Sequence, residues 1–140
     1  MTDILQNQIL ITSLLSWSIA QGIKLIINTT KNCTLDLSIM LSTGGMPSSH
    51  TATVVAMATK VGLVEGFYST YFAIAVVFSA VVMYDAMGLR RQAGKHAQLI
   101  NLLTSELPNK PKLKELLGHK PAEVFFGMLL GVLVAHLYGL

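Results

Sequence analysis

The sequence predicts an all-α integral membrane protein with about four transmembrane helices and one short amphipathic helix. Its 140 residues are 52% hydrophobic and only 12% charged, with a mean hydropathy of +0.58. Soluble domains carry about 25% charged residues, roughly twice this share. The apolar residues form long runs separated by short polar breaks, as membrane helices require. We therefore expect a single membrane domain over residues 1–140.

The first predicted membrane helix runs from about Ile4 to Asn28, which is long enough to span a bilayer. The residues before it include Asp3 and no Lys or Arg, unlike a signal peptide, so we expect the helix to be retained. Gln21, Lys24 and Asn28 recur at helical spacing near its end. A lysine in a membrane helix is costly unless it faces protein or water. Lys24 is therefore a functional candidate, with snorkelling to the headgroups as the alternative.

Three further apolar runs predict the remaining membrane helices, and one amphipathic run predicts the short helix. The membrane helices are expected at Ser48 to about Gly66, at Thr70 to Met83 with continuation through Asp85, and at Pro121 to Leu140. Leu99, Ile100, Leu103 and Leu107 lie on one side of a predicted amphipathic helix from His96 to Leu107.

The break Gly44–Thr51 is rich in glycine and hydroxyl side chains and ends beside His50. Glycines allow close approach of the backbone to a ligand, and the start of a helix presents free amide hydrogens. This combination favours an anion site next to an imidazole. The alternative is an ordinary turn in which Ser48 or Ser49 caps the following helix.

A cluster of charged residues follows the third predicted membrane helix. Asp85 stands at the negative end of that helix and needs a cationic partner. Four basic residues follow at once: Arg90, Arg91, Lys95 and His96. Because Gly88 and Gly94 bracket the arginines, we expect a loop between helices here and not one continuous helix.

The segment before the last helix combines His119, Pro121 and Glu123. Proline suits the first position of a helix, and an acidic residue in the first turn favours the helix dipole. That structural role alone could explain Glu123.

The distribution of basic residues predicts the topology. Of the ten Lys and Arg, seven lie between Arg90 and Lys120, and the C-terminal segment beyond has none. With four membrane helices, the positive-inside rule puts the first and third loops in the cytoplasm. The net charge of +3 is thus explained by a membrane face and not by nucleic acid. Four segments meet at this face: Lys24, Gly44 to His50, Asp85 to His96, and His119 to Glu123.

Cations, backbone amides and imidazoles at one membrane face describe a phosphate site with acid–base groups. The sequence has no local metal-ligand pattern, and Cys33 is the single cysteine, so neither a metal nor another cofactor is expected. The residue types favour metal-free phosphoryl transfer, with one histidine attacking phosphorus and another protonating the leaving oxygen.

Three motifs carry a resemblance to a known family. They are GGMPSSHTA at 44–52, YDAMGLRRQAGKHA at 84–97 and LGHKPAEV at 117–124. Together they resemble the divergent branch of the type 2 phosphatidic acid phosphatase (PAP2) superfamily, known as the DUF212 or YuiD-like family. The superfamily also includes the vanadium-dependent haloperoxidases. The resemblance implies a trimmed PAP2-like helical bundle and phosphatase chemistry on lipid phosphates or isoprenoid pyrophosphates.

Carried over to this sequence, the resemblance implies that His96 is the nucleophile and His50 the general acid. The implied phosphate-binding residues are Lys24, Gly45, Ser48, Ser49, Arg90 and Arg91. The superfamily places an aspartate four residues after the nucleophile, where this chain has Ile100. Asp85 or Glu123 could supply the carboxylate from another segment, and His119 could also belong to the site.

The sequence favours two classes of function and leaves a structural or scaffolding membrane protein as the remaining alternative. The first is a metal-independent phosphatase that forms a phospho-histidine. The second is an inactive module that binds or transports lipid phosphates, which Ile100 favours. Both predict a lipid-phosphate ligand in a multi-pass membrane protein, and small residues on the helix faces are compatible with a homodimer.

Overall fold

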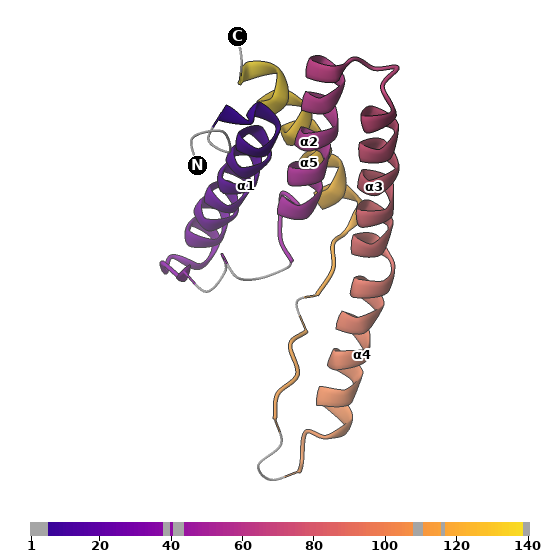
Figure 1. Cartoon of the computed structure of the whole chain (residues 1–140). Helices are drawn as coiled ribbons and strands as arrows, with labels where there is room; N and C mark the ends of the chain where they lie inside the picture. Colours follow the sequence, from indigo (N-terminus) through magenta and orange to yellow (C-terminus); the bar gives the residue numbers. More distant parts are fainter. Residues whose placement is uncertain (1–5, 38–39, 41–43, 108–110, 116, 139–140) are drawn as a thin grey trace.

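The computed structural model describes residues 6–37, 40, 44–107, 111–115 and 117–138. Within this part of the chain all regular structure is helical (Figure 1). The helices are α1 (Gln8–Asn32), α2 (Ser49–Glu65), α3 (Thr70–Met87), α4 (Leu89–Leu103) and α5 (Pro121–Leu137).

Helix α2 is the centre of the bundle, because it packs against α1, α3 and α5 (Figure 1). Its contact with α5 depends on two glycines four residues apart. A Cβ on Gly127 would lie 2.6 Å from the carbonyl oxygen of Ser48, and one on Gly131 would lie 2.7 Å from that of Ala52. The two helix backbones therefore touch, as in small-residue packing between membrane helices.

The side chains are distributed as a lipid environment requires. The buried hydrophobic residues are mainly alanine and valine, whereas large apolar residues of α1, α3 and α5 point outward. Several buried side chains of α1 are polar, and Ser16 bonds across to the Ala52 carbonyl. This pattern is typical of helices that pack through small and polar groups and expose apolar surface to lipid.

Two helical segments among the described residues are long and apolar enough to cross a membrane: α1 and the run Thr70–Leu103, which combines α3 and α4. The regular structure of the described residues is thus all helical, with two candidate spans among them, and α5 is a shorter apolar helix. The second run has 34 residues. At about 1.5 Å per residue it measures about 51 Å, which is longer than the ~30 Å hydrocarbon core of a bilayer.

The prediction of a loop over the arginines, between α3 and α4, was wrong. Helix α4 begins at Leu89, directly after Gly88, so Arg90, Arg91 and His96 are all helical. Gly94 lies inside α4, where it allows another segment to pack closely and does not form a turn. A Cβ there would lie 2.7 Å from the carbonyl oxygen of Glu115, because the segment before α5 crosses α4 at this point.

The predicted boundaries also shift. Helix α1 continues through Lys31 to Asn32, into the segment expected to be a polar linker. The amphipathic helix exists, but it starts at Leu89 and ends at Leu103 instead of spanning His96 to Leu107.

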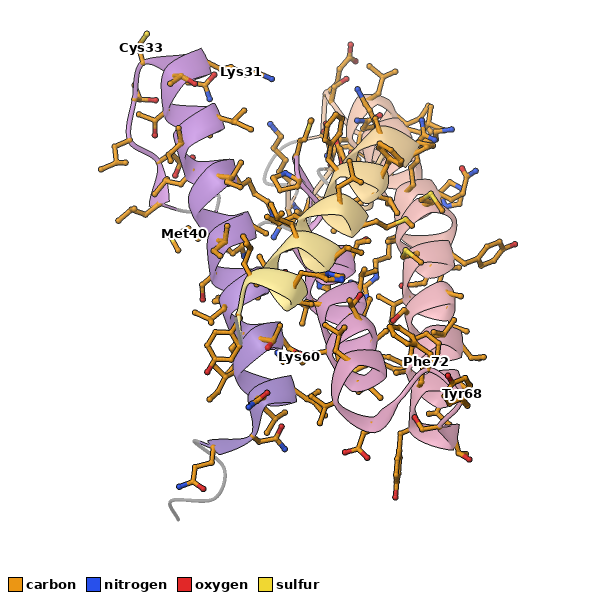
Figure 2. All side chains as sticks on the ribbon, turned by 90° about the horizontal axis from the view of Figure 1, so that it is seen from above. Lys31, Cys33, Met40, Lys60, Tyr68 and Phe72 are labelled. Carbon is orange, nitrogen blue, oxygen red and sulfur yellow. The ribbon has the colours of Figure 1, made fainter. Side chains whose placement is uncertain are left out.

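Lys60 lies among the helices of the bundle (Figure 2). It is buried and donates a hydrogen bond to the Tyr138 carbonyl, at the opposite end of α5 from Glu123. A cation at the C-terminal end of α5 complements the helix dipole. This contact explains a lysine deep in α2 without a catalytic role.

Candidate functional site

The segment that leads into α5 is anchored on the junction of α3 and α4. The backbone N–H of His119 donates to the Ala86 carbonyl at 2.9 Å. The preceding residue, Gly118, has φ +74, and a Cβ on it would lie 2.3 Å from the backbone nitrogen of Arg91. Only glycine fits this contact, which places His119 inside the bundle with 2% of its surface exposed.

Glu123 holds the His119 ring. One carboxylate oxygen, Oε2, lies 3.0 Å from His119 Nδ1 and also accepts the backbone N–H of Lys120 at 3.2 Å. The main chain of Glu123 accepts a further hydrogen bond, from the Ser48 N–H at 2.9 Å. Glu123 therefore lies in the first turn of α5, as expected, and it also contacts the buried imidazole of His119.

Lys24 lies against the glycine break, on the other side of this cluster. Its side chain is 2% exposed, and its Cδ and Cγ would lie 3.4 Å from a Cβ on Gly45. Gly45 has φ +95, a conformation that glycine adopts without strain. The charge of Lys24 acts on both His119 and Glu123. The snorkelling alternative does not describe a lysine buried in this way.

His50 meets His119 across the interface of α2 and the loop before α5. Their ring centroids are 6.3 Å apart with an edge-on arrangement. The position of His50 follows from the cap before it: the Ser48 hydroxyl accepts the Thr51 N–H at 3.3 Å. The expectation that Ser48 or Ser49 caps the helix is thus confirmed for Ser48.

Ser48 and Ser49 are both buried next to this cap. The Ser48 hydroxyl oxygen accepts hydrogen bonds from both the amide and the hydroxyl of Thr51. Its acceptor capacity is therefore used within the fold.

Asp85 pairs with Arg90, as its place at the end of α3 predicted. Arg90 Nε lies 2.6 Å from Asp85 Oδ2. Both residues and His50 line a small pocket of about 200 Å³. Asp85 therefore stands on the His50 side of the cluster.

A second pocket, of about 290 Å³, lies on the His119 side. It is lined by glycine backbone, three basic side chains, the His119–Glu123 pair and two further polar side chains, Gln98 and Glu115. Its polar lining includes Gly44, Gly45, Arg91, Lys95, His119, Lys120 and Glu123. We call it the basic pocket. Basic side chains and glycine backbone are the groups that bind phosphate oxygens.

His96 is an exposed residue of α4 and is not among the residues that line the basic pocket. Ile100, one turn further on, is 46% exposed and offers no carboxylate. Arg90 and His96 are about 120° apart on the helix. The structure therefore brings Lys24, Gly45, His50, His119 and Glu123 together and leaves His96 outside.

A sequence signal for the His119–Glu123 pair was present. The superfamily spaces its histidine and orienting carboxylate four residues apart, and His119 and Glu123 have this spacing. The prediction of a carboxylate at position 100 rests on His96, the histidine with the matching distance from Arg90. In this fold Arg90 belongs to α4, whereas His119 belongs to the segment before α5.

The pKa of His119 is lowered, chiefly because burial disfavours the charged ring. The hydrogen bond to Glu123 and its negative charge raise this pKa, and so does the nearby Gly45 backbone. The positive charge of Lys24 lowers it, as burial does. His119 is therefore held neutral at neutral pH. Among the described residues, no group of three or more metal-ligating side chains is found.

These observations define a class: a helical protein with apolar outer surfaces and a basic pocket lined by the His119 imidazole, with the His50 imidazole beside it at 6.3 Å between ring centroids. The model of the divergent PAP2 family, DUF212, matches residues 5–134, so the chain belongs to that family. It is 43% identical to the uncharacterized membrane protein YuiD of Bacillus subtilis (strain 168), over 94% of each chain. No solved structure matches it.

Proposed function

We propose that this protein is a metal-independent phosphatase that hydrolyses lipid phosphates or pyrophosphates through a phospho-histidine. The observation that supports it best is the His119–Glu123 pair in the wall of the basic pocket, beside Lys24 and His50. A buried neutral imidazole supplies a nucleophile, a second imidazole supplies a proton, and cations stabilise charge on the phosphoryl oxygens.

The position of the site favours lipid substrates. The basic pocket lies where the apolar α3 gives way to the charged α4. At such a boundary a phosphate group could enter the pocket while its acyl or isoprenoid chain stays in the hydrocarbon layer.

The test is phosphate release from detergent-dispersed phosphatidate, isoprenoid phosphate and isoprenoid pyrophosphate with a chelator present. Wild type is compared with Lys24→Gln and with Lys31→Gln, a matched change at an exposed lysine of the same helix. Removing a group that stabilises transition-state charge costs about 10²–10³-fold in kcat, which we expect for Lys24→Gln. Lys31→Gln should keep wild-type turnover. No release from any substrate would reject the proposal.

The alternative is a module that binds or transports lipid phosphates without chemistry. The exposure of His96 and the apolar Ile100 favour it, because the expected nucleophile has no carboxylate partner there. It predicts saturable binding of the same lipids, weakened by Lys24→Gln, with no phosphate released by wild type.

We further propose a multi-pass topology of four crossings with the site at the cytoplasmic face. The excess of Lys and Arg between Arg90 and Lys120 supports this orientation. Cys33, the single cysteine, is exposed at the end of α1 and provides a natural probe. A membrane-impermeant maleimide should label it in inverted vesicles and not in intact cells; the reverse pattern would overturn the orientation.

A further inference from the structure

The basic pocket is elongated along α4. Its lining on this helix extends from Arg91 to Gln98, and this part of the helix is about 10 Å long. The segment before α5 forms the facing wall and runs in the opposite direction. A Cβ on Gly118 would meet the backbone of Arg91, whereas one on Gly94 would meet the carbonyl oxygen of Glu115. The pocket thus has one end beside Gly118 and another beside Glu115.

The two ends differ in chemistry. The end beside Gly118 contains Arg91, with Lys120 two residues further along the chain and Lys95 one helical turn from the arginine. The other end contains Gln98 and Glu115. A carboxylate only accepts hydrogen bonds, and its negative charge repels a phosphate. A group bound at this end must therefore donate hydrogen bonds and carry no negative charge.

Asn101 holds the Glu115 carboxylate in position. Its Nδ2 donates to Glu115 Oε1 at 2.7 Å and to the Leu113 carbonyl at 2.9 Å, and its Oδ1 accepts the Leu113 N–H at 3.0 Å. The side chain of Glu115 is thereby fixed to α4 together with its own backbone segment. Because a carboxylate offers about four acceptor positions, the contact with Asn101 orients the group and leaves it able to accept from a ligand.

We propose that Gln98 and Glu115 form a second subsite of the basic pocket, which binds a hydroxyl group of the substrate whose phosphate lies among the cations. The substrate class is then a phosphate monoester with a free hydroxyl close to the phosphate. The inference rests on the proposed function, which assigns the cationic end of the pocket to the phosphate.

The charges around Glu115 favour a hydroxyl over an ammonium group, which also donates hydrogen bonds. Arg91, Lys95 and Lys120 line the same pocket and repel a second cation. A neutral hydroxyl avoids this repulsion and still donates to the carboxylate. The charge of Glu115 also disfavours a second phosphate, so the subsite selects monophosphates over pyrophosphates.

The experiment compares two non-hydrolysable ligands by isothermal titration calorimetry of the full-length protein in detergent. The ligands are butyl phosphonate and a dihydroxybutyl phosphonate, which differ only in the hydroxyl groups. Hydrogen bonds to charged groups are worth about 10- to 100-fold in affinity, and neutral ones about 2- to 10-fold. We therefore expect wild type to bind the dihydroxy ligand about 10-fold more tightly or better.

Glu115→Gln is the informative variant, because its amide oxygen can still accept from Asn101 while the negative charge is lost. We expect it to lose most of the preference for the dihydroxy ligand, by about 10-fold. It should bind butyl phosphonate at least as tightly as wild type does, since a negative charge has left a phosphate pocket. Glu106→Gln is the matched control, an exposed acidic residue that does not line the pocket, and should keep the wild-type preference.

The same subsite should act on lipids. Lysophosphatidate has a free hydroxyl beside its phosphate-bearing carbon, whereas phosphatidate has none. The ratio of their kcat/KM values should fall by about 10-fold on Glu115→Gln. Comparing this ratio between wild type and variant cancels the difference in how the two lipids enter detergent micelles.

Three results would overturn the subsite: equal binding of the two phosphonates by wild type, no binding of either, or an unchanged preference in Glu115→Gln. Weaker binding of both phosphonates by Glu115→Gln would assign the residue a structural role only and would also overturn it. The phosphatase function fails separately, because phosphonate binding requires no hydrolysis. A wild type that prefers the dihydroxy ligand but releases no phosphate from any lipid would reject the phosphatase and leave the subsite standing.

Discussion

Gly118 lies directly on the backbone of Arg91, so closely that a Cβ would come within 2.3 Å of the Arg91 nitrogen. This contact joins the loop before α5 to the first turn of α4. It is the reason that His119 enters the bundle and that Arg91 lies on the wall of the same pocket.

Gly118→Ala should therefore destabilise the fold and abolish turnover. The alanine would meet backbone atoms, and φ +74 is unfavourable for any L side chain. Thermal unfolding in detergent, followed by circular dichroism, should show a clearly lower midpoint. Gly22→Ala is the matched control, because nothing lies within 4 Å of its Cβ position, and it should leave the midpoint unchanged or slightly raised. Equal midpoints for both variants would contradict the contact.

The two arginines should differ in their effect on substrate binding. Arg91 lines the basic pocket, whereas Arg90 is paired with Asp85 at 2.6 Å. A hydrogen bond from a charged group contributes about 1.5–3 kcal/mol, so Arg91→Gln should raise KM by about 10- to 100-fold. Arg90→Gln should raise it less, since its charge is already balanced. Steady-state kinetics on one lipid phosphate decides this, and a larger effect at Arg90 would place the phosphate on the other side of the cluster.

The requirement for His50 should depend on the leaving group. An alkoxide needs a proton as it leaves, whereas p-nitrophenolate leaves without one. His50→Gln should thus lose about 10²–10⁴-fold in the first step on phosphatidate and little in the first step on p-nitrophenyl phosphate. Rapid-quench measurement of the first turnover on each substrate is the appropriate assay. If both substrates lost the same factor, His50 would not be the general acid.

The protein should become less stable as the pH is lowered, because His119 is buried. Its pKa in the folded state lies below the ordinary value of 6.5, mainly because it is buried. The unfolded chain then binds more protons, so the contribution is complete above pH 6.5 and is lost as pH falls below it. The unfolding midpoint of wild type should drop between about pH 7 and pH 5 more steeply than that of His119→Gln. Parallel curves for the two proteins would show that another group is responsible.

Some features of this protein follow from local chemistry and were therefore predictable. The apolar runs, the few charges and the helix-start residues are properties of neighbouring residues, so they predicted helices close to α1, α2, α3 and α5. Ser48 as a cap, Asp85 with a cationic partner, and the three family motifs also followed from local sequence.

Other features depend on which segments touch, and no short-range pattern contains that information. Gly94 resembled a turn residue, but it lies inside α4, which also contains both arginines. The absence of a side chain at Gly94 makes room for the carbonyl groups of Glu115 and Leu117. His96 had the expected spacing from Arg90, yet helical geometry turns it away from the pocket. His119 looked accessory until tertiary packing buried it against Glu123 and His50. The sequence alone determined a helical membrane protein of the divergent PAP2 family, because composition and motifs are local. Only the tertiary structure decided which histidine faces the basic pocket, since that depends on contacts between residues far apart in the chain.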